Sequence, residues 1–258
     1  CQFCVNKIYN KCTPHSPLNE FMDMSRPKLC FLDDNFFACS NWLNIINVVK
    51  ATNKRFQFKQ GLDERLLTKE KISEINSWKY DGEFIFAFDN IEDEKLIKDK
   101  LELIYATIPE WKKQVKFYCF TGFDRAGVYD DIFWRDDIIN LVYRMIILSK
   151  YSAIPYVMRH ENYKNSPYQA FYNAIAAWGN QPQFFKSFTL EEFCKCRGMK
   201  FEGYKKYKRD INGYLAEYGK DSKGSSWVAY EEYVEKNGDN KLFHIIPRDN
   251  AKYGANVV

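Results

Sequence analysis

The chain has 258 residues, of which 46% are hydrophobic and 28% are charged, a balance typical of a globular protein rather than a disordered one. Its formal net charge of +4 is mild for this length, so it permits an anionic substrate without indicating one. No apolar run reaches the length of a membrane-spanning helix, and the longest, residues 138–148, contains Asn140 and Arg144. No signal peptide is recognisable, and we expect a folded protein that does not enter a membrane.

Eight cysteines are spread over the chain, at Cys1, Cys4, Cys12, Cys30, Cys39, Cys119, Cys194 and Cys196. A secreted disulfide framework is usually found in a much shorter chain. Cys30, Cys39 and Cys119 lie in apolar stretches, where a free thiol packs as a small hydrophobic group. We therefore expect free thiols and a location in the reducing cytoplasm.

Short apolar runs rich in Phe, Tyr, Ile and Val alternate with amphipathic segments. The runs favour strands, at residues 29–32, 56–60, 84–88, 115–121 and 154–158. The amphipathic segments favour helices, at residues 42–50, 69–78, 92–108, 130–149 and 164–177. Thr68 is the expected N-cap of the second helix, Pro109 ends the third, and Pro167 is expected in the first turn of the last.

This alternation predicts βαβ units and a parallel sheet, with a repeat of roughly thirty residues. The carboxyl ends of such strands share one rim, which carries the active site in barrels of this class. Polar residues follow every predicted strand, and the carboxylates among them are Asp33, Asp34, Asp63, Asp89, Asp124 and Glu161. Any one of these residues is equally well explained as a helix N-cap. Their recurrence after all the strands favours a shared functional rim.

The pattern weakens after about residue 180. Residues 195–209 contain seven Lys or Arg and one Glu, interleaved with Phe201, Tyr204 and Tyr207. Such a segment is compatible with a nucleic-acid surface, but a solvated basic face is the favoured interpretation.

The first cysteines, Cys1 and Cys4, form a C-x-x-C pair that several chemistries use. Zinc could be bound by these two thiolates together with Cys12 and His15, and Cys194 and Cys196 could also join a metal site. A redox C-x-x-C normally stands between a strand and a helix, and the residues after Cys4 are not a convincing amphipathic helix.

The same segment resembles the cluster-binding loop of radical S-adenosylmethionine (SAM) enzymes, which bind a [4Fe–4S] cluster through C-x-x-x-C-x-x-C. Cys1 and Cys4 match the second and third cysteines, and Phe3 matches the aromatic residue that precedes the last one. The resemblance implies that the first cysteine and the first barrel strand precede Cys1. With two of three ligands, we expect the chain as given not to hold its cluster stably.

Further motifs match this family in order over about residues 1–180. "LCFLDDNFF" resembles the second strand and its loop, which meets the methionine amine of SAM. "FKQGLDERLLT" is similar to the third-strand segment, which reaches the SAM carboxylate or the substrate. "FAFD", "FYCFTGFD" and "PYVMR" resemble the later strands, whose ends meet the ribose and the adenine. The resemblance therefore implies cofactor-binding roles for Asp33, Asp34, Asn35, Gln60, Arg65, Asp89, Gly122 and Met158.

The resemblance implies an α/β fold: a partial (β/α)6 TIM-like barrel over residues 1–180 with a mixed C-terminal extension over residues 181–258. It implies an enzyme that reductively cleaves SAM to a 5′-deoxyadenosyl radical, using an electron donor such as flavodoxin or ferredoxin. Two alternatives stay open on the residues alone. One is a zinc-stabilised nucleic-acid-binding module, and the other is a metal-dependent TIM-barrel hydrolase that uses Asp33, Asp89 and Asp124.

Overall fold

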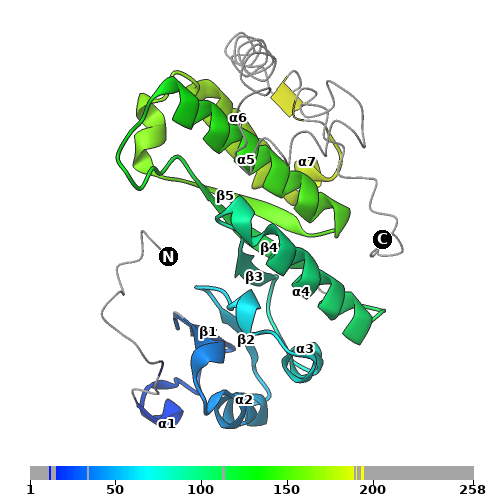
Figure 1. Cartoon of the computed structure of the whole chain (residues 1–258). Coiled ribbons are helices and arrows are strands. Elements are labelled where there is room, and N and C mark those ends of the chain that lie inside the picture. The colour runs from blue at the N-terminus through cyan, green and yellow to red at the C-terminus, as the bar shows by residue number, and fades with distance from the viewer. Residues whose placement is uncertain are drawn as a thin grey trace. The chain divides into compact units, whose positions relative to one another are not determined.

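The computed structural model describes residues 12, 16–33, 35–111, 114–188, 190, 193 and 194 (Figure 1). Several sequence predictions lie outside these described residues: the cluster ligands Cys1 and Cys4, Phe3, His15, Asp34, Cys196 and the basic segment 195–209. Two compact units make up the chain, residues 1–87 with 96–116, and residues 88–95 with 117–258. The predicted boundary between residues 180 and 181 stays a prediction.

The first unit contains two parallel strands, β1 (Lys28–Phe31) and β2 (Arg55–Phe58), in a register that pairs Leu29 with Phe56 and Phe31 with Phe58. Its helices are α1 (Leu18–Phe21), α2 (Trp42–Ala51) and α3 (Lys69–Asn76). It also holds β3 (Phe84–Ala87) and most of α4 (Glu94–Thr107). Thr68 caps α3 as predicted, because its side chain accepts a hydrogen bond from the Lys71 amide.

An aromatic cluster forms the core of this unit. Phe36 stacks on Phe58 with ring centroids 4.4 Å apart, and Tyr80 stacks on Phe84 at 4.1 Å. Trp78 packs between these pairs, 5.9 Å from Phe58 and 6.2 Å from Phe84. Phe58 at the carboxyl end of β2 and Phe84 at the amino end of β3 thus meet in one core.

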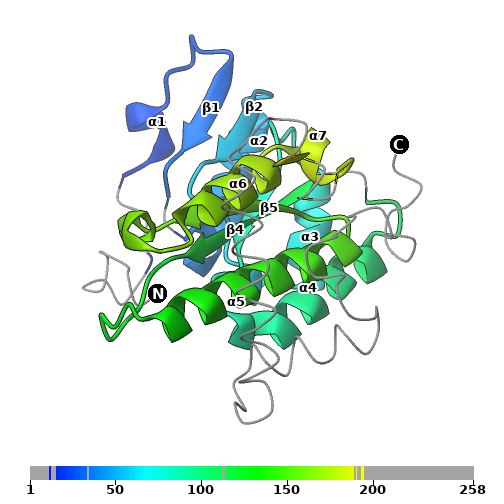
Figure 2. The same ribbon diagram turned by 90° about the horizontal axis from the view of Figure 1, so that it is seen from above.

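The second unit contains most of β4 (Val115–Thr121), and β5 (Ile154–Arg159), α5 (Asp131–Lys150), α6 (Gln169–Gly179) and α7 (Pro182–Phe185). The helices α5 and α6 lie side by side on one face of β5 (Figures 1 and 2). They approach closely at Gly179, where a β-carbon would stand 2.8 Å from the Met145 methyl group. Val157 of β5 lies at this contact, 3.4 Å from the position of that β-carbon, and Phe117 and Cys119 of β4 are buried.

The described strands form two parallel sheets, β1-β2 and β3-β4-β5, and no closed barrel. The prediction of an α/β fold with parallel strands is therefore confirmed. None of the described helices is both long and apolar enough to cross a membrane.

Two local predictions were wrong. The helix expected at residues 164–177 begins only at Gln169, after a 3₁₀ turn at Glu161–Asn165. Ser166, with ψ of 138°, is extended because a residue before proline disfavours the helical conformation. Cys30 was expected to pack as a hydrophobic group but is exposed, because it lies on the outward face of β1. Cys39 and Cys119 are buried as free thiols.

Candidate functional site

A tight turn after β2 positions the charged residues of the candidate site. Gly61 has φ of +90°, and a β-carbon there would lie 3.0 Å from the carbonyl oxygen of Ile85. The glycine is therefore needed both for its conformation and for the close approach of the backbone. The next amide, that of Leu62, donates to the same Ile85 oxygen at 2.7 Å. This contact fixes Asp63 and the 3₁₀ turn η2 (Glu64–Leu66) beside the carboxyl end of β3.

Asp63 and Arg65 form a bidentate ion pair in this turn. The Arg65 Nε and Nη2 atoms donate to the two carboxylate oxygens of Asp63 at 2.8 and 2.7 Å. The Arg65 amide also donates to Asp63 Oδ1, at 3.1 Å. Such a fork-like pair fixes the direction of a guanidinium as well as its charge. Arg65 is thus held by an ion pair within its own turn.

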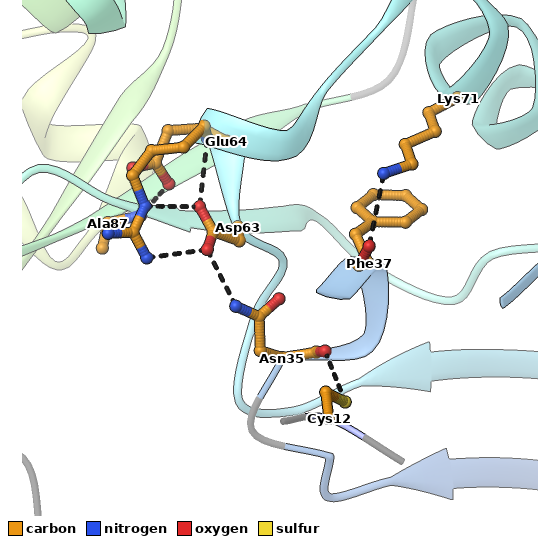
Figure 3. Close-up of polar contacts among 8 residues, drawn as sticks. Cys12, Asn35, Phe37, Asp63, Glu64, Lys71 and Ala87 are labelled. Carbon is orange, nitrogen blue, oxygen red and sulfur yellow. Dashed lines mark hydrogen bonds and ion pairs between the residues drawn. The ribbon is translucent and has the colours of Figure 1, made fainter. Parts of the chain in front are cut away.

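Asn35, which follows β1, joins this pair, and Cys12, which precedes β1 in the chain, contacts Asn35 (Figure 3). Asn35 Nδ2 donates to Asp63 Oδ2 at 2.8 Å, and Cys12 Sγ donates to the backbone oxygen of Asn35 at 3.2 Å. The side-chain oxygen of Asn35 is buried and has no hydrogen-bond partner among the described residues. A buried acceptor of this kind costs about 1–3 kcal/mol unless a donor satisfies it.

Neighbouring carboxyl groups in this turn have opposite pKa shifts. Burial by itself would raise the pKa of Asp63, but hydrogen bonds from Arg65 and Asn35 outweigh it and hold that pKa below its usual value. Burial raises the pKa of Glu64 to about 7, and the charge of Asp63 adds to this effect. The Ala87 amide donates to Glu64 Oε2 at a long distance of 3.4 Å. Glu64 can therefore exchange a proton near neutral pH.

Lys71 forms hydrogen bonds to the loop after β1 and to the loop after β2. Its Nζ donates to the backbone oxygens of Phe37 at 3.3 Å and Leu66 at 3.1 Å, and it lies 5.0 Å from the centre of the Phe37 ring (Figure 3). Desolvation lowers the pKa of Lys71. The lysine thus connects the residues after β1 to those after β2, and its role is structural.

An open, mostly apolar pocket of about 730 Å³ lies beside this site in the first unit. Its lining includes Cys12, Asp33, Phe31, Phe36 and Phe58. A volume of this size accommodates a small organic ligand. The predicted cofactor residue Asp33 therefore lines a pocket, whereas Gln60, at the end of β2, is exposed to solvent.

The other predicted residues belong to the second unit. Asp89, for which the sequence predicts a role in ribose binding or helix capping, has its Oδ1 bonded to the Phe120 amide, which donates at 2.9 Å. Burial raises the pKa of Asp89. Gly122 has φ of +79° at the end of β4, and Met158 is 40% exposed on β5. Phe123 and His160 stack edge to face nearby, with centroids 5.1 Å apart.

Sequence reasoning missed the charged residues of α5. Asp137 Oδ2 accepts hydrogen bonds from Thr121, Gly122 and Tyr172, and Arg144 donates to the carbonyl oxygens of Phe88 and Phe120. One signal was present in the sequence, since Arg144 stands inside an otherwise apolar helical segment.

The structure thus brings together Asn35 and Arg65, through Asp63, and adds Glu64 and Cys12 to them. Among the described residues, no three His, Cys, Asp or Glu side chains are grouped as a metal site. No protein-family model, curated protein or solved structure matches this chain.

Proposed function

We propose that this chain is most of a radical SAM enzyme, built on a partial (β/α)6 TIM-like barrel. The proposal is supported by the parallel βα units and by the polar residues after β1 and β2. The observation that carries it is the buried side-chain oxygen of Asn35, which has no partner among the described residues. This oxygen lies at the carboxyl end of β1, where the family resemblance puts the contact to the methionine amine of SAM.

The chemistry of the first unit fits SAM. An amide oxygen accepts a hydrogen bond from an ammonium group, so the amine of SAM would satisfy Asn35 Oδ1. Asp33, and Asp34 beside it in the sequence, would add negative charge toward the same amine. Asp63 holds the guanidinium of Arg65 in one direction, and this group, with Gln60, would bind the carboxylate of SAM or of a substrate.

Cys1 and Cys4 would hold the [4Fe–4S] cluster together with a third thiolate from a preceding segment, with Phe3 beside it. When bound, the cluster supplies the electron for reductive cleavage of SAM, which yields the 5′-deoxyadenosyl radical that abstracts a hydrogen from substrate. The ends of the later strands, at Asp89, Gly122 and Met158, would bind the ribose and the adenine. The electron would come from a donor such as flavodoxin or ferredoxin, and the free thiols suit the cytoplasm.

The decisive experiment is metal analysis of the anaerobically purified gene product, including the residues encoded upstream of Cys1. The proposal expects roughly four irons and four sulfides per chain, and dithionite-dependent release of 5′-deoxyadenosine from SAM. Cys4→Ala should abolish both results, whereas Cys30→Ala should change neither, because Cys30 is an exposed free thiol on β1. Stoichiometric zinc with no iron–sulfur absorbance would refute the proposal and favour the zinc-stabilised module. Activity that survives Cys4→Ala would instead favour the hydrolase.

A second experiment tests the observation that carries the proposal. Asn35→Ala should weaken SAM binding by about tenfold, the value of one hydrogen bond to a charged group. Asn76→Ala is the matched control, since Asn76 is an exposed asparagine of the same unit, at the end of α3 and outside the pocket lining. Equal SAM affinity in both variants would argue against a role for Asn35.

A further inference from the structure

Helix α5 carries two charged side chains toward the sheet of the second unit. Arg144 is 2% exposed and Asp137 is half-buried. Residues seven positions apart lie on the same face of a helix, so both side chains point to the same side of α5. Removing a charged group from water costs free energy unless hydrogen bonds satisfy it. The hydrogen-bond partners of Asp137 and Arg144 therefore identify the backbone segments that these side chains fix.

Both charged groups hold the carboxyl ends of strands. Asp137 Oδ2 accepts hydrogen bonds from Thr121 Oγ1 at 2.5 Å, from the Gly122 amide at 2.9 Å and from the Tyr172 hydroxyl at 2.6 Å. Arg144 donates through Nη1 to the backbone oxygen of Phe88 at 2.5 Å, and through Nη2 to that of Phe120 at 2.9 Å. Both of these phenylalanines adjoin Asp89. Phe88 precedes it in the chain, and the Phe120 amide donates to its carboxylate.

We propose that Asp137 and Arg144 are positioning residues that fix the backbone at Gly122 and Asp89 for binding the nucleoside half of SAM. This inference rests on the proposed function, which assigns these two positions to adenine and ribose. Arg144 sets the direction of the strand end that leads to Asp89, and Asp137 sets the conformation of Gly122.

The conformation of Gly122 explains why the anchor matters. With φ of +79°, Gly122 occupies a region that glycine enters and leaves at little cost. The hydrogen bond from its amide to Asp137 selects this one conformation. Without that acceptor the turn samples others, while the apolar residues of α5, such as Ile138 and Leu141, remain packed. Loss of Asp137 therefore affects ligand affinity through the turn, beyond any effect on folding.

The test compares α5 variants of the full chain by equilibrium dialysis with 5′-deoxyadenosine, and by hydrogen exchange at the Gly122 amide. Asp137→Asn should weaken nucleoside binding by about tenfold or more and accelerate that exchange, because hydrogen bonds to a charged acceptor are lost. Tyr172→Phe removes one donor and keeps the carboxylate, so it should weaken binding by about threefold. If Asp137→Asn does not fold, Tyr172→Phe provides the test by itself.

Controls separate positioning from a general loss of stability. Asp131→Asn changes an exposed aspartate on the same helix, and Ile147→Val destabilises the core of α5 without touching the strand ends. Both should keep the wild-type affinity and the wild-type exchange at Gly122. Wild-type affinity in Asp137→Asn, or an equal loss in Ile147→Val, would overturn the inference and leave the proposed function intact. A wild-type chain that binds no 5′-deoxyadenosine would overturn both.

Discussion

Glu64 makes a sharp test of the site possible, because the residue is 9% exposed and burial is the main influence on the pKa of its carboxyl group. Arg65, the nearest basic residue in the chain, is paired with Asp63. The Glu64 carboxyl group accepts only weak backbone hydrogen bonds, one of them from the Ala87 amide at 3.4 Å. The ionised form is therefore poorly solvated in the folded protein, and Glu64→Gln should remove this cost while keeping the size of the side chain.

The magnitude follows from the pKa of Glu64, which burial raises from 4.5 to about 7. This difference corresponds to about 3 kcal/mol, since each pKa unit is worth about 1.4 kcal/mol. Below pH 4.5 the Glu64 carboxyl group is neutral in both the folded and the unfolded chain, so the stability that its raised folded-state pKa allows is fully present. This stability is lost as the pH rises through 7, because the unfolded chain ionises first. Relative to the wild type, Glu64→Gln should therefore gain about 3 kcal/mol in free energy of unfolding between pH 4.5 and pH 8.

Urea unfolding followed by tryptophan fluorescence, at intervals from pH 4.5 to 8, measures this gain. Glu74→Gln is the matched control: burial favours a higher pKa for Glu74, but hydrogen bonds from Lys50 and Trp78 outweigh it and lower that pKa below 4.5. Its contribution is lost only in more acidic solution, so its difference from the wild type should stay constant over this range. A difference for Glu64→Gln that does not change with pH would refute the reasoning.

Further changes test the framework of the site by urea unfolding. Gly61→Ala should cost about 1 to 3 kcal/mol, because φ is +90° and the new methyl group meets the Ile85 oxygen; Gly127→Ala, with φ of +75° and open space around it, should cost about 1 kcal/mol. Equal costs would contradict the close approach at Gly61. Thr68→Ala should cost about 1 kcal/mol through the lost cap of α3, and Thr68→Ser should restore most of it. Asp63→Asn should cost about 2 kcal/mol at pH 7, and this cost should shrink as the pH falls below 3.8, since hydrogen bonds keep the folded-state pKa of Asp63 below that value against the effect of burial. A cost that persists in acid would show that the carboxylate charge is not the stabilising feature.

Local patterns in the sequence predicted most of the fold. Apolar runs of strand length became β1 to β5, and Thr68 began α3 as expected, because side-chain alternation and capping depend on residues close together in the chain. The error at residues 164–177 has the same local origin. Pro167 was expected inside the first helical turn, but its effect on the preceding Ser166 delayed the helix to Gln169.

The candidate site depends on contacts between distant positions, which no local pattern contains. The sequence suggests Asn35 and Arg65 because each lies in a family-like motif after a predicted strand. Only the folded chain shows that Asp63 joins them and that Asn35 keeps a buried oxygen without a described partner. The hydrogen-bond donors to the Asp137 carboxylate likewise come from distant positions, at the end of β4 and on α6. Alternation and charge, read along the chain, determined a parallel α/β protein with polar strand ends. Only tertiary structure decided which carboxyl groups form ion pairs and which have a pKa raised by burial, because desolvation and hydrogen bonding depend on neighbours in space.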